Sequence, residues 1–191
     1  MTDGPFRNAE LSRPWKRYGD ELVSDAASTE ERSKQACYSI IDGADVKAFS
    51  PLFNELKGYA ERPQMDLDAV AAIETIFENH PMSPLSDILQ RHLIANLWDQ
   101  IHPEKALDQA LDSAAKEWIG ITQNRLDEHC IRARDRGDMS AEAYRKGIER
   151  NHEAFAAISP SELCDALATG NKRAFSQAVR KRAGVDDGPD Q

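Results

Sequence analysis

The sequence has few cysteines and none of the paired spacing that disulfide frameworks and zinc sites use. Cys37, Cys130 and Cys164 are the three cysteines of a 191-residue chain, and they lie far apart. An odd number of widely spaced cysteines predicts free thiols in a reducing compartment. The N-terminus also lacks the basic and then apolar segments of a signal peptide. We therefore expect a cytoplasmic protein.

Long apolar runs are missing as well. The longest apolar runs, such as residues 69–73, are far shorter than the roughly 20 apolar residues that a membrane span needs. We therefore expect no membrane association. Hydrophobic residues make up 40 % of the chain and charged residues 30 %, with a formal net charge of −9. This balance excludes a disordered polyelectrolyte and favours one folded domain. The Ala-, Arg- and Asp-rich composition is typical of a protein from a high-GC bacterial genome.

No stretch of useful length alternates apolar and polar residues, so the sequence predicts no β-strand. Helix-start and helix-stop residues recur throughout instead. The pattern predicts an all-α fold, an irregular bundle of about seven to eight helices. We expect an irregular N-terminal arm over 1–14, a single helical domain over 15–184 and an acidic, frayed tail over 185–191.

Individual helix boundaries follow from the same residues. The Ser-Pro pairs at 50–51 and 83–84 predict helix starts, because proline suits the first helical position. Asp66 or Asp68 is expected to cap the helix between these two. From Pro103 to Arg136 nothing interrupts the helical pattern, which predicts a helix about 50 Å long. Gly137 should end it, and the short link predicts an antiparallel hairpin of 103–136 with 140–158.

The long helix carries an apolar stripe whose spacing averages 26/7 residues, nearer to an eleven-residue than to a seven-residue repeat. A sustained left-handed coiled coil is therefore disfavoured. The stripe consists of Leu107, Leu111, Ala114, Trp118, Thr122, Leu126, His129 and Ala133.

The motifs of common enzyme classes are absent from the sequence. It has no Gly-x-Ser-x-Gly turn, no P-loop and no dinucleotide-binding glycine pattern. His129 and Cys130 are adjacent, and neighbouring helical positions point about 100° apart, so they cannot form an activated pair. Cys37 and Cys164 lie among apolar residues and are interpreted as small buried side chains. We expect a non-catalytic protein that needs no cofactor.

One weak metal-binding pattern remains. Glu149 and His152 form a Glu-x-x-His pair on one helix face, the unit that di-iron bundles use twice. Here it occurs once, so a surface role for both residues is favoured, and a metal-dependent helical-bundle enzyme is a remote alternative.

Charge is distributed unevenly. Residues 61–112 hold ten acidic and three basic side chains, whereas 171–183 holds five basic side chains and no acidic one. A basic helix can bind phosphates, so a nucleic-acid-associated regulator is the alternative function, although the net charge opposes it. A solvated helix end is the favoured interpretation. The basic residues are Lys172, Arg173, Arg180, Lys181 and Arg182.

Aromatic residues suggest a partner surface. Trp15 and Tyr18 should anchor the N-terminal segment, and Ile94 and Trp98 lie off the main apolar stripe of their helix. Core packing is the favoured interpretation for Trp98 and Trp118, and contact with another chain is the alternative for Trp98. The sequence therefore favours a helical protein-interaction module, an accessory subunit, adaptor or regulator, whose partner is another protein or a second copy.

Overall fold

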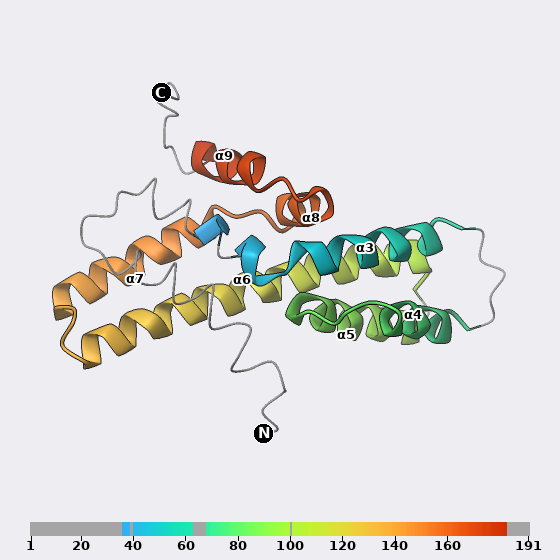
Figure 1. The fold of residues 1–191 in the computed structure, drawn as a ribbon, viewed down its shortest axis with the longest axis horizontal. Helices are drawn as coiled ribbons and strands as arrows, with labels where there is room; N and C mark the ends of the chain where they lie inside the picture. The colour runs from blue at the N-terminus through green and yellow to red at the C-terminus, as the bar shows by residue number, and fades with distance from the viewer. Residues whose placement is uncertain (1–35, 39, 63–67, 100, 183–191) are drawn as a thin grey trace. The chain divides into compact units, whose positions relative to one another are not determined.

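The structure is a computed structural model, and it describes residues 36–38, 40–62, 68–99 and 101–182. Every regular element in these ranges is a helix, so the predicted all-α class is confirmed (Figure 1). The predicted arm and tail, together with Trp15 and Tyr18, lie outside the described residues.

Seven complete helices follow helical turns at 36–38 and 40–43 in the described chain. None of the described helices combines the length and the apolar character that crossing a bilayer requires. The helices are α3 (Val46–Ala60), α4 (Ala69–Glu78), α5 (Pro84–Trp98), α6 (Pro103–Asp135), α7 (Ala141–Ala156), α8 (Pro160–Thr169) and α9 (Lys172–Arg182).

The described residues divide into two compact units. The α3–α5 unit comprises residues 44–118 and 160–170, and it contains α8 and the first half of α6. Within it, α3 packs against α8 and α4, and α4 packs against α5. The α7–α9 unit comprises the described parts of 36–43, 119–159 and 171–182, with the second half of α6. The predicted single domain over 15–184 stays a prediction.

Two of the predicted helix starts are confirmed. The Asp68 carboxylate accepts a hydrogen bond from the Ala71 N–H at 3.0 Å and caps α4. Pro84 is the first residue of α5, and Ser83 and Ser86 cap it reciprocally. The Ser86 N–H donates to the Ser83 hydroxyl at 3.1 Å, and the Ser83 N–H donates to the Ser86 hydroxyl at 2.6 Å.

The prediction that a helix begins at Ser50–Pro51 is wrong. Helix α3 starts one turn earlier, at Val46, after Asp45 in a left-handed conformation with φ of 49°. Pro51 therefore lies inside the helix. Ser50 caps nothing there, and its hydroxyl donates to the carbonyl oxygen of Ala168 in α8 at 3.1 Å. A tertiary contact between distant segments replaces the local cap that the sequence suggested.

Helix α6 ends as predicted. Gly137 has φ of +79°, a left-handed conformation that glycine adopts at little cost. The Gly137 N–H donates to the Arg134 carbonyl and the Asp138 N–H to the Ala133 carbonyl, each at 2.9 Å. These two bonds form a Schellman motif, which satisfies the last carbonyls of the helix.

Side chains of α6 and α7 meet after this turn. His152 Nε2 lies 3.0 Å from Asp127 Oδ2, and the Asn151 amide nitrogen lies 3.8 Å from Cys130 Sγ. These contacts hold α7 against α6, and the antiparallel hairpin of 103–136 with 140–158 stays a prediction. Figure 1 shows α7 returning from the turn that ends α6.

The apolar stripe of α6 is largely buried. Trp118 and Thr122 have no exposed surface, and Leu111 and His129 are half-buried. The other members of the stripe are buried. Since the stripe runs through both compact units, α6 supplies core residues to each of them.

Glu117 links α5 to α6. Its carboxylate accepts a hydrogen bond from Arg91 Nη2 at 2.9 Å and lies 2.8 Å from His92 Nε2. Burial acts to raise the pKa of Glu117, but the hydrogen bonds and charges of Arg91 and His92 outweigh it and hold the pKa below its ordinary value. Arg91 and His92 therefore favour the charged form of the Glu117 carboxylate in the folded state.

Replacing Glu117 by glutamine is expected to lower the free energy of unfolding by about 1 kcal/mol at pH 7, because partly exposed charge pairs contribute little more. A carboxylate whose pKa is lowered by folding stabilises the fold at pH values above its pKa in the unfolded chain. This stabilisation is lost as the pH falls through its pKa in the folded chain. The difference from the unmodified chain should thus shrink toward pH 3, measured by urea unfolding. Glu74→Gln, on an exposed site of α4, is the control. A difference that is the same at pH 7 and pH 3 would contradict the expectation.

Candidate binding groove

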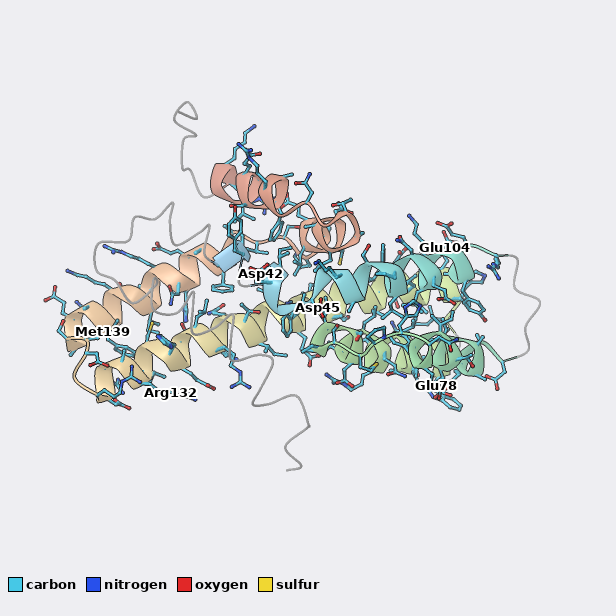
Figure 2. The ribbon with its side chains drawn as sticks, viewed as in Figure 1. Asp42, Asp45, Glu78, Glu104, Arg132 and Met139 are labelled. Carbon is cyan, nitrogen blue, oxygen red and sulfur yellow. The ribbon has the colours of Figure 1, made fainter. Side chains whose placement is uncertain are left out.

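Three helices of the α3–α5 unit enclose a cavity of 340 Å³. It lies between the C-terminal half of α3, the first turns of α6 and the start of α8, and Figure 2 shows Glu104 beside the C-terminal end of α3. Its volume is within the range of ligand pockets. We call it the acidic groove, and its lining residues are Phe53, Lys57, Ala60, Glu61, Glu104, Leu107, Asp108, Leu111, Asp112, Ser161, Cys164 and Asp165.

The floor of the acidic groove is apolar. Ala60 and Leu107 are buried, and Phe53 and Leu111 are half-buried, so part of each of the latter two faces the open space. The Phe53 ring stacks on Phe49, with 6.1 Å between the ring centroids. Because Phe49 is buried, this stacking fixes the wall that α3 contributes.

The rim of the groove is strongly acidic. Five carboxylates and one ammonium group, that of Lys57, belong to the lining. Lys57 lies 3.9 Å from Glu61, and Asp112 pairs with Lys116 at 2.6 Å just outside the lining. These pairs are more than half exposed and contribute little stability. The carboxylates therefore leave a negative field over an apolar floor.

Cys164 lies in the wall of the groove, half-buried, where the sequence predicts a buried side chain. Its thiol lies 3.7 Å from the Leu111 carbonyl oxygen, to which it donates. Burial, and then the negative charges of Asp165 and Asp112, raise the pKa of the Cys164 thiol to about 11. The thiol is consequently protonated near pH 7 and is a poor nucleophile there. Its place in the groove suits contact with a ligand better than reaction with one.

The arrangement can recognise a molecule that combines positive charge with apolar surface. Carboxylates attract cations, and covering the exposed parts of Phe53 and Leu111 is favourable because it removes apolar surface from water. The twelve lining residues include no histidine that could act as a general base near neutral pH.

Trp98 is exposed, in contrast to the favoured interpretation that it fills the core. Its side chain is 71 % exposed at the last residue of α5, while Ile94 is half-buried. Trp118, for which core packing was also favoured, is buried. Sequence periodicity placed Trp98 off the main stripe, but no signal in the sequence says whether another helix covers it.

The basic C-terminal helix presents part of its charge to solvent. Arg173, Lys181 and Arg182 are exposed on α9, whereas Phe175, Ser176 and Val179 are buried. The side chains of Lys172 and Arg180 are not among those that the structure describes. Arg182 donates to the Ala157 carbonyl oxygen at 2.5 Å, so its guanidinium group is anchored to the end of α7.

The Glu149–His152 pair is not assembled into a metal site in the structure. Both residues are exposed on α7, and the His152 imidazole contacts Asp127. Among the described residues, no group of three or more histidine, cysteine, aspartate or glutamate side chains is placed to hold a metal ion.

The acidic groove was not predicted from the sequence. Glu104, Asp108 and Asp112 recur at four-residue spacing in α6, a pattern that also agrees with the helix dipole. The spacing alone could have suggested one charged face. Glu61 and Asp165 join that face only through the packing of α3 and α8.

Comparison with known proteins gives no further assignment. No family model matches the sequence, and neither the curated proteins nor the solved structures contain a match.

Proposed function

We propose that this chain is a non-catalytic protein-interaction module, an accessory subunit, adaptor or regulator, that binds a positively charged segment of another protein in the acidic groove. The observation that carries the proposal is the groove itself, in which five carboxylates surround an apolar floor. Interfaces that combine an apolar centre with a charged rim gain affinity from the centre and specificity from the rim.

Two further observations support this proposal. Trp98 is exposed, and tryptophan is among the residue types that contribute most to binding at interfaces, so α5 offers a second contact to a partner or to another copy. None of the three cysteines is exposed and none forms a disulfide, which suits the bacterial cytoplasm that we propose as the site of action.

The proposal is tested by neutralising one row of carboxylates. The variant Glu104→Gln/Asp108→Asn/Asp112→Asn should bind a fluorescent lysine- and leucine-rich peptide at least ten times more weakly at low salt, by anisotropy titration. The control Glu74→Gln/Glu78→Gln/Glu149→Gln changes the net charge equally at exposed sites outside the groove and should retain affinity. Equal weakening in both variants would show attraction by net charge alone and would overturn the proposal.

The exposed cations of α9 favour one second candidate, a nucleic-acid-associated regulator. Duplex DNA in the same titration separates the two functions. Tight, salt-dependent DNA binding that is lost in Arg173→Ala/Lys181→Ala would favour this alternative over a peptide-binding groove.

A further inference from the structure

The acidic row of α6 has a regular spacing. Glu104, Asp108 and Asp112 are four residues apart, and a rise of 1.5 Å per residue places successive members about 6 Å apart along the helix axis. All three line the acidic groove. A second helix lying along α6 repeats its own side chains with the same rise, so cations at four-residue intervals on it would meet each carboxylate.

An apolar row runs beside the acidic one. Leu107 and Leu111 follow Glu104 and Asp108 by three residues each, which places them on a neighbouring stripe of the same helix. Both leucines line the groove, and Phe53 extends the apolar surface from α3. The occupant must therefore carry an apolar stripe next to a cationic stripe, the pattern of an amphipathic helix.

We propose that the occupant of the acidic groove is a basic amphipathic helix of a partner protein. Its lysine or arginine residues, four positions apart, face Glu104, Asp108 and Asp112, and its apolar stripe covers the exposed parts of Leu111 and Phe53. This inference rests on the proposed function and specifies the chemistry of the partner. A flexible polyamine would satisfy the carboxylates, but its single methylene chain would cover less of the apolar floor than the side chains of a helix.

Cys164 provides an independent measure of occupancy. It lines the groove and is half-buried, whereas Cys37 and Cys130 are buried, so under native conditions a maleimide should modify Cys164 before the other two. A helix seated on the floor should slow this modification at least five-fold. The effect is measured by mass spectrometry over long reaction times at mildly alkaline pH. The pKa of about 11 keeps the ionised fraction of the thiol small, but this fraction is larger than near pH 7.

The experiment compares four probes on the full chain. The first is an alanine-based peptide with lysine at every fourth position and leucine three positions after each lysine. The second has the same sequence except for one central alanine replaced by proline, which breaks the helix. The third carries glutamate in place of lysine, and the fourth is spermidine. We expect the first peptide to bind at least ten times more tightly than the second and alone to protect Cys164.

Each other outcome has a distinct meaning. If the helical and proline peptides bind equally, and both lose affinity in the Glu104→Gln/Asp108→Asn/Asp112→Asn variant, the helix inference is overturned and the proposed function stands. Protection of Cys164 by spermidine as strong as that by the helical peptide overturns the inference in favour of a small polycation. Binding that is unchanged in this variant overturns the inference and the proposed function together. Asp108→Lys, a single exposed change, repeats the test in case the triple variant does not fold.

Discussion

Replacement of Trp118 by alanine is expected to lower the free energy of unfolding by about 3–5 kcal/mol, because the largest side chain of the core would leave a cavity. Trp118 has no exposed surface and lies in the centre of the buried stripe of α6. Since a domain of ordinary stability has about 5–15 kcal/mol in total, this change should remove roughly a fifth of the stability or more. Urea unfolding followed by circular dichroism measures the loss.

Trp98→Ala is the matched control for this prediction. The residue type and the substitution are the same, but Trp98 is 71 % exposed, so the expected change is within about 0.5 kcal/mol. The two variants together test the burial that the structure assigns to each tryptophan. Equal losses in the two variants would contradict it.

Replacement of Pro51 by alanine is expected to stabilise the chain by about 2 kcal/mol. Proline inside a helix lacks the N–H that would bond to the carbonyl four residues earlier, and it costs about 3 kcal/mol relative to alanine. The unfolded chain of the alanine variant has more conformational freedom, and this offsets about 0.5–1 kcal/mol of the gain. Pro51 is exposed in α3, so the substitution removes no buried surface.

Pro84→Ala is the control, because Pro84 is the first residue of α5 and lacks no helical hydrogen bond there. We expect no stabilisation from it. The comparison, by thermal and urea unfolding, tests the start of α3 at Val46. If Pro51→Ala also gives no gain, the helix begins at Pro51 as the sequence suggests and the turn before it is not helical.

The features that could be predicted from the sequence are those that nearby residues determine. Asp68, Ser83 and Gly137 act on backbone groups within a few positions of themselves, so their roles as caps and stop are visible in the sequence. The buried stripe of α6 follows from helical periodicity in the same way. Long-range contacts have no such local signature. Ser50 resembles a cap, but its hydroxyl bonds to Ala168 in α8, and this could not be foreseen.

The acidic groove was unpredictable for the same reason. Its carboxylates come from α6, from α8 and from the residue that follows α3. The Asp165 side chain joins Glu61 only because α3 and α8 pack together. In the sequence, the acidic excess of residues 61–112 indicates charge but not where it gathers. Trp98 shows a related limit. Its position off the main apolar stripe of α5 could be predicted from the sequence, but its exposure to solvent could not.

The pairing of α3 with α8 also has a consequence for synthesis on the ribosome. The hydrogen bond from Ser50 to Ala168 spans 118 positions, so α3 emerges long before the helix that completes its unit. At typical rates of translation the delay is roughly 6–24 s. During that interval the nascent chain exposes the apolar face that α8 later covers. Chaperone demand should therefore peak before α8 leaves the exit tunnel.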